Sequence, residues 1–152
     1  MELILNLLKE DHKKFRSVLN EIKEHTKNFN KEPETPKERF NVIKNMVFTL
    51  HKFTILTYAF KRHVELRDLL LSTFLLKSEF KEETDKLEVC QENITVLLRS
   101  VKDDFLKLKK RKPNSIGKIA STTLRKFTKI CNVFEEFIVC EERIFKKIKI
   151  EQ

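Results

Sequence analysis

The sequence predicts an all-α protein, an antiparallel up-and-down four-helix bundle. The 152 residues include one Gly and three Pro, too few for the many tight turns of a sheet-rich fold. The balance of 40% hydrophobic and 36% charged residues is typical of long amphipathic helices with charged outer faces. Apolar residues also recur at intervals of three and four along four long segments joined by short connections. With no internal repeat visible, we expect residues 1–152 to form a single domain.

The first helix is predicted to run from about Glu2 to about Lys27 and to end in the polar residues 28–30. One face of this segment is apolar at helical spacing, which indicates the side that packs in the bundle. That face is made of Leu3, Ile4, Leu7, Leu8, Phe15, Val18, Leu19 and Ile22.

The second helix has the clearest start signal in the chain. Thr35 can cap the helix, Pro36 suits its first turn, and Glu38 stands where the acid of a capping box belongs. The helix is predicted to run to about Phe60. Its apolar face is expected to comprise Phe40, Ile43, Met46, Val47, Leu50, Thr54, Ile55 and Tyr58.

The segment from Lys61 to Phe80 keeps helical spacing, and no Gly or Pro breaks it. We interpret it as an extra helical piece between the second and third helices, either separate from the third or continuous with it. The third helix carries Leu87, Cys90, Ile94, Leu97, Leu98, Val101, Phe105 and Leu106. A loop is predicted over Arg111 to Gly117, where Pro, Asn, Ser and Gly gather. The fourth helix should follow to about Ile148.

The formal net charge of +9 favours solubility and weak binding to polyanions. A nucleic-acid module should show stacking or base-reading residues beside its basic patch. The chain has no Trp and one Tyr, so we expect no specific nucleic-acid partner. The longest uncharged stretches, such as Leu69 to Leu76, are too short to span a membrane.

The three cysteines form no close pair and lie among apolar residues at helical spacing. This pattern is typical of reduced, buried thiols. The first residues, MELILNLLKED, lack the basic start of a signal peptide, and a cytoplasmic location is therefore expected. No nucleophile-and-base arrangement is visible, and one Gly excludes the usual Gly-rich phosphate loops. The sequence does not predict an enzyme.

Four polar residues interrupt the apolar faces. His12 lies between Leu8 and Phe15, and His51 is four residues from both Val47 and Ile55. Glu141 and Glu142 stand in the fourth helix just before Phe145; by contrast, His25 and His63 are expected to face solvent. A bundle core brings side chains from several helices to one level, and iron and similar ions take His nitrogen and carboxylate oxygen.

Two segments resemble the hemerythrin (HHE cation-binding) family. They are LILNLLKEDHKKFRSVLNEIKEH near the start and NVFEEFIVCEERIFKKI near the end. The resemblance implies a four-helix bundle holding two oxygen-bridged non-haem irons that bind dioxygen or sense oxygen, iron or nitric oxide. It also implies metal ligands at His12 in the first helix, His51 in the second, and the acidic pair Glu141 and Glu142 in the fourth.

The same resemblance shows departures from the family pattern. Ile55 stands where the family has a bridging Glu, Asn93 where the third helix supplies His, and Phe137 where the fourth helix supplies His. These three residues are expected to line the site rather than to bind metal. Their presence argues against an intact di-iron centre.

Two functions follow from this pattern. The preferred one is a hemerythrin-like protein that holds a single iron or similar divalent ion through His12, His51 and Glu141 or Glu142, for sensing or storage rather than dioxygen carriage. The alternative is a metal-free interaction or structural protein of the same fold, in which the remaining polar groups bond to each other or to water. The apolar segment Leu66 to Phe80 could then support a homodimer.

Overall fold

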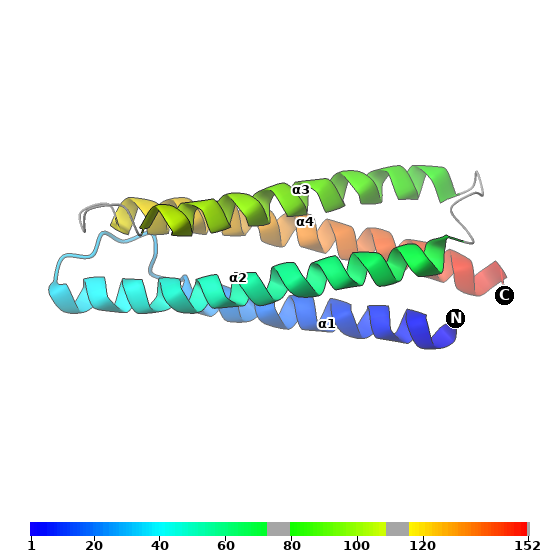
Figure 1. Ribbon diagram of the computed structural model, residues 1–152, viewed down its shortest axis with the longest axis horizontal. Coiled ribbons are helices and arrows are strands. Elements are labelled where there is room, and N and C mark those ends of the chain that lie inside the picture. The colour runs from blue at the N-terminus through cyan, green and yellow to red at the C-terminus, as the bar shows by residue number, and fades with distance from the viewer. Residues whose placement is uncertain (73–79, 109–115, 152) are drawn as a thin grey trace.

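The computed structural model is a bundle of four helices that run in alternating directions, with both termini at the same end (Figure 1). The structure describes residues 1–72, 80–108 and 116–151. The helices are α1 (Glu2–His25), α2 (Pro36–Leu71), α3 (Lys81–Leu108) and α4 (Ile116–Glu151), and the described residues contain no strand. The predicted all-α four-helix bundle is therefore confirmed. None of the described helices has a stretch long and apolar enough to cross a membrane.

The core follows a heptad pattern, in which buried positions alternate by three and four residues. In α2 these positions are Val42, Met46, Thr49, Phe53, Leu56, Phe60, His63, Arg67 and Leu70. In α4 they are Ala120, Thr123, Phe127, Ile130, Phe134, Phe137, Glu141, Ile144 and Ile148. A mean spacing of 3.5 residues keeps one seam facing the neighbouring helices, as in coiled coils. Polar residues that fall on this seam are thereby carried into the core.

The predicted inward face of α2 is wrong. Most of its residues point to solvent, including Phe40 at 67% and Tyr58 at 79% exposure, although Met46 is buried. The reason is that α2 carries two apolar stripes on opposite sides, and the spacing of residues does not tell which stripe meets the other helices. The same ambiguity affects the start of α1, where Leu3 is exposed and Leu5 is buried.

The start of α2 is formed by the predicted capping box. The Thr35 hydroxyl accepts a hydrogen bond from the Glu38 backbone N–H at 3.1 Å. The Glu38 carboxylate accepts one from the Thr35 N–H at 3.3 Å and one from the Glu34 N–H at 2.8 Å. These contacts satisfy backbone donors that have no partner within the helix.

The end of α2 differs from the prediction. The helix does not stop near Phe60 but continues to Leu71, so residues 61–71 of the extra piece belong to the second helix rather than to the third. Of the predicted self-association segment, Leu70 and Leu71 lie in the core and Phe80 is buried, whereas Leu69 is 66% exposed. Residues 73–79 of that segment, and residues 111–115 of the predicted loop, lie outside the described residues.

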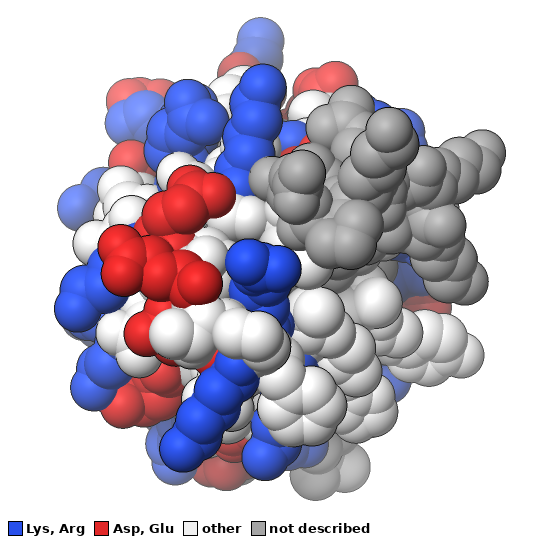
Figure 2. All heavy atoms as spheres, turned by 90° about the vertical axis from the view of Figure 1, so that its left-hand side faces the viewer, with Lys and Arg blue, Asp and Glu red and all other residues white. Residues whose placement is uncertain are grey.

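The single glycine of the chain lies in the first turn of α4 rather than in a loop. A Cβ atom at Gly117 would lie 2.8 Å from Oε1 of Glu32, so the missing side chain makes room for that carboxylate. A negative charge is favourable at the start of a helix. This contact places the connection between α1 and α2 against the start of α4. Figure 2 shows this end of the bundle, where a group of acidic side chains lies among basic ones.

Candidate metal centre

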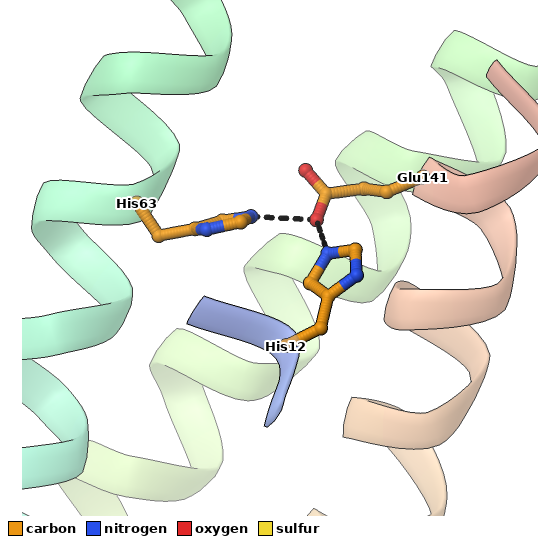
Figure 3. Close-up of side chains that lie close together, drawn as sticks. All are labelled: His12, His63 and Glu141. Atoms are coloured by element: carbon orange, nitrogen blue, oxygen red, sulfur yellow. Dashed lines mark hydrogen bonds and ion pairs between the residues drawn. The ribbon is translucent and has the colours of Figure 1, made fainter. Parts of the chain in front are cut away.

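Three side chains from three helices converge in the core. They are His12 of α1, His63 of α2 and Glu141 of α4, and Figure 3 shows both imidazole rings directed at the same carboxylate. Oε1 of Glu141 lies 2.9 Å from Nε2 of His12 and 2.6 Å from Nε2 of His63. His12 is 1% exposed and the other two are fully buried. All three occupy positions of the heptad seam, which explains why the fold brings them together.

Asp11 supports this cluster from α1. Its Oδ2 lies 3.1 Å from Nδ1 of His63, and its Oδ1 accepts a hydrogen bond from Nη2 of Arg62 at 3.1 Å. Asp11 is 4% exposed. A carboxylate beside Nδ1 holds the ring proton there and turns Nε2 toward Glu141, which is the arrangement that commonly orients metal-binding histidines.

Arg67 brings a buried positive charge to the same level of the bundle. Its Nη1 lies 3.7 Å from Oε2 of Glu141, and its Nη2 donates to Oε1 of Gln91 in α3 at 2.7 Å. Its Nε and Nη2 also donate to Oδ1 of Asp68, at 3.1 and 2.7 Å. Every helix therefore contributes to one polar layer, and Arg67 balances the charge of Glu141 when no metal ion is bound.

Aromatic rings surround the two histidines. Phe145 stacks on His12, with ring centroids 5.9 Å apart and an angle of 10° between the planes. Phe15 and Phe137 meet His63 edge-on, at centroid distances of 5.1 and 5.9 Å. These contacts fix the two rings and exclude water, so the electrostatic interactions among the polar groups are strong.

The Glu141 carboxyl is ionised in this environment. Burial raises its pKa, but the hydrogen bonds and charges of His12 and His63 outweigh burial and hold the pKa below its usual value. Its two oxygens are used unequally, since Oε1 meets both histidines and Oε2 makes no hydrogen bond within the described residues. The positive partner near Oε2 is the guanidinium of Arg67, whose Nη1 lies 3.7 Å away.

The residues present fit a metal ion. Two imidazole nitrogens and a carboxylate are the donor set that holds iron(II) with open positions, and they also suit other first-row divalent ions. Two ligands at right angles and about 2.1 Å from one ion lie about 3 Å apart, close to the two observed Nε2–Oε1 distances of 2.9 and 2.6 Å. An ion would replace the protons now shared between the histidines and Glu141, because only neutral imidazole nitrogen binds metal.

The predicted ligands are only partly brought together. His12 and Glu141 belong to the cluster. Glu142 lies at its edge, with Oε1 3.5 Å from Nδ1 of His12 and a side chain that is 42% exposed. Phe137 is fully buried and lines the cluster against His63.

The other predictions at this site need correction. His51 is exposed on the outer side of α2 rather than facing inward, so it lies apart from the cluster. Ile55 is 40% exposed and Asn93 is exposed, and neither lines the cluster. The predictions for His51 and Ile55 are wrong because they take the exposed apolar stripe of α2 as its inward face.

The histidine that α2 does contribute had been expected to face solvent. His63 follows Phe60 by three residues on the buried stripe and is fully buried. The spacing of residues does indicate the burial of His63. Buried positions in α2 recur every three or four residues from Val42 to Phe60, and the next position in this series is His63. His25, the other histidine expected at the surface, is half-buried, with Nδ1 3.4 Å from Oδ1 of Asn45.

Comparisons with protein-family models, curated proteins and solved structures found no match for this chain. The buried cluster of His12, His63 and Glu141 is the feature of the described residues that bears most directly on function.

Proposed function

We propose that this protein binds a single divalent transition-metal ion, iron(II) or a similar ion, through His12, His63 and Glu141, as a divergent hemerythrin-like bundle. The convergence of three ligand atoms, all within 4.8 Å of one another and all buried, carries the proposal. The role that suits a buried single-ion site is sensing or storage of the metal rather than dioxygen carriage.

Three features favour one ion over two. The carboxylate of Asp11 is engaged by His63 and Arg62, which leaves Glu141 as the carboxylate directed between the histidines. Arg67 then stands beside Oε2 of Glu141, where a second cation would be repelled. Phe137 fills the adjacent space with an apolar ring. A bridged pair of ions would need further carboxylate or imidazole ligands at this level.

The hydrogen bonds of the cluster support reversible metal binding. Without metal, Oε1 of Glu141 bonds to both His12 and His63, and Oε2 lies near the positive charge of Arg67. With metal, the same three ligands would bind the ion while Asp11 keeps its hydrogen bond to His63. The bundle can therefore keep one fold in both states, and its stability would report whether metal is bound.

Metal titration tests the proposal. Protein stripped with a chelator is titrated without oxygen with iron(II), and separately with cobalt(II), whose visible absorption reports its ligands. We expect one ion per chain, and loss of at least tenfold in affinity for His63→Gln and Glu141→Gln, since each removes one of three ligands. His51→Gln is the matched control on the same helix and should bind normally. Absence of stoichiometric binding, or equal loss in the control, would contradict the proposal.

A second candidate, the interaction protein, is favoured by the outer face of α2. We define this outer α2 face by Phe40, Ile43, Val47, Ile55 and Tyr58, whose exposures range from 40% to 79%. It lies opposite the buried stripe, so α2 is apolar on both sides. A helix that is apolar all round is normally covered on both sides, and exposed patches of this kind mark interaction sites.

The spacing on this face suits a second copy of the chain. Phe40 and Tyr58 are each nine positions from residue 49, and Ile43 and Ile55 are each six positions from it. Two antiparallel α2 helices related by a twofold axis at that level would set Phe40 of one copy against Tyr58 of the other, as a self-complementary interface requires. In sedimentation equilibrium we expect a dimer that Val47→Glu dissociates and Val96→Glu, an exposed control on α3, leaves intact. A monomeric wild type would exclude this candidate.

A further inference from the structure

A basic pocket lies between α1 and α4 on the far side of His12 from the buried cluster. The basic pocket is lined by Lys9, His12, Lys13, Arg16, Glu142, Phe145, Lys146 and Lys149, and its volume is about 340 Å³. Five of these eight residues are cationic, and Glu142 is the one acid among them. Pockets of this size accommodate small ligands rather than a protein surface.

Not all of the basic charge in this pocket is neutralised. Arg16 pairs with Glu135 at 2.8 Å, and Lys13 pairs with Glu10 at 2.8 Å. Lys9, Lys146 and Lys149 make no ion pair with any side chain that the structure describes. Three such lysines that line the basic pocket favour a multiply charged anion. The flexible lysine side chain can bring its positive point charge to a phosphate oxygen.

The floor of the basic pocket is a buried polar group without a hydrogen bond. His12 is 1% exposed, and its Nδ1 makes no hydrogen bond within the described residues. Oε1 of Glu142 is nearby, at 3.5 Å, but its side chain is 42% exposed and free to turn away. Phe145, stacked on the ring, holds His12 in this orientation. When Nδ1 carries the ring proton, a bound anion would supply the acceptor that this nitrogen lacks.

We propose that the basic pocket binds a phosphate group, free or on a small ester, with Lys9, Lys146 and Lys149 around it and Nδ1 of His12 beneath it. A phosphate group carries about 1.5 to 2 negative charges at pH 7 and offers three or more strong acceptor oxygens. The volume of about 340 Å³ and the buried imidazole of His12 favour a small tetrahedral anion over an extended polyanion.

The position of His12 links this pocket to the buried cluster, a step that rests on the proposed metal function. A metal on Nε2 requires the ring proton to be on Nδ1, which makes Nδ1 a donor toward the pocket. One charge-assisted hydrogen bond gained in this way corresponds to about a tenfold higher phosphate affinity. By reciprocity, phosphate would raise the metal affinity by the same factor.

Phosphate titration followed by ³¹P and ¹⁵N NMR tests the pocket. Metal-free protein at constant ionic strength is titrated with inorganic phosphate and, separately, with glycerol phosphate. We expect saturable binding that shifts the Nδ1 resonance of His12, and about a fivefold loss for the double variant Lys146→Gln, Lys149→Gln. The double variant Lys44→Gln, Lys129→Gln removes the same charge from exposed sites elsewhere and should bind as wild type.

Each outcome is decisive. An equal loss of phosphate affinity in both double variants would show a general effect of net charge and would overturn the proposal. Binding that does not saturate with either phosphate would also overturn it. Repeating the titration on metal-loaded protein tests the link. If phosphate binds the metal-free protein but its affinity does not change with metal, the pocket stands and the link is overturned. If no metal binds at all, the metal-free titration still decides the pocket.

Discussion

Glu141 is the residue on which the buried cluster depends. It is the carboxylate that faces both histidines and the guanidinium of Arg67. Burying a charge is costly unless it is paired, and removing one partner of a buried pair leaves the other partner unbalanced. The importance of this residue therefore does not depend on whether a metal ion is present.

Replacing Glu141 should destabilise the metal-free bundle. We expect Glu141→Gln to lower the free energy of unfolding by about 3 kcal/mol, because the buried side chains of His12, His63 and Arg67 lose the carboxylate that they share, and Arg67 keeps only the exposed Asp68 as an ionic partner. Urea unfolding at pH 7 measures this change. Glu142→Gln is the matched control, since this neighbouring acid is 42% exposed and surface changes of this kind stay within about 0.5 kcal/mol. Equal effects of the two variants would contradict the description of Glu141.

The cysteines should be poorly reactive in the folded protein. Burial raises the pKa of the Cys131 thiol to about 11, and it also raises the pKa values of Cys90 and Cys140. The reactive thiolate is therefore scarce at pH 8 and increases as the pH approaches 11. With a disulfide reagent at pH 8 we expect slow reaction of the native protein and fast reaction of three thiols after unfolding in urea. Fast labelling of native Cys131 would show the assigned environment to be wrong.

At the scale of the helix, α2 shows what its sequence can and cannot predict. The capping box at Thr35 and Glu38 follows from local chemistry alone, and both of its hydrogen bonds are present. The inward face of α2 does not follow from local chemistry, because both sides of the helix are apolar and only the neighbouring helices decide which side is buried. This is why His12 and Glu141, on α1 and α4, were found from the sequence while His63 was missed. Arg67 follows His63 by four residues on the same buried stripe and is missed for the same reason. Asp11 and Gln91 reach the cluster through tertiary contacts that residue spacing does not reveal.

The cap should contribute measurably to the stability of α2. We expect Thr35→Ala to lower the free energy of unfolding by about 1 kcal/mol, because the Glu38 N–H loses its acceptor. Thr54→Ala serves as the control, since Thr54 is exposed in the middle of the helix and its hydroxyl bonds only to the Leu50 carbonyl. Ala favours helix there, so this change should be neutral or slightly stabilising. A Thr35→Ala variant as stable as wild type would contradict the cap.

At the scale of the whole molecule, the polar layer joins helices that otherwise pack in two pairs. The most extensive contacts are between α3 and α4 and between α1 and α2. His12, His63 and Glu141 connect the first pair to the second through the core. An ion held by these residues would therefore cross-link both pairs, and its binding free energy would add to that of folding.

Metal should accordingly raise the stability of the bundle. With free ion at about 100 times its dissociation constant, binding adds about 2.7 kcal/mol to the free energy of unfolding. We expect thermal unfolding of the wild type to move to higher temperature with iron(II) or cobalt(II) and to return after chelation. Because its affinity should be at least tenfold lower, the His63→Gln variant should show at most about half of this stabilisation at the same ion concentration. An equal shift in that variant would place the ion elsewhere.

Anomalous diffraction from crystals of the metal-loaded protein, recorded at the absorption edge of the ion, tests the central claim most directly. One peak per chain is predicted, at about 2.0–2.2 Å from Nε2 of His12, Nε2 of His63 and a carboxylate oxygen of Glu141. A loaded crystal with no peak in the core, or with its peak at His25 or His51, would contradict the claim.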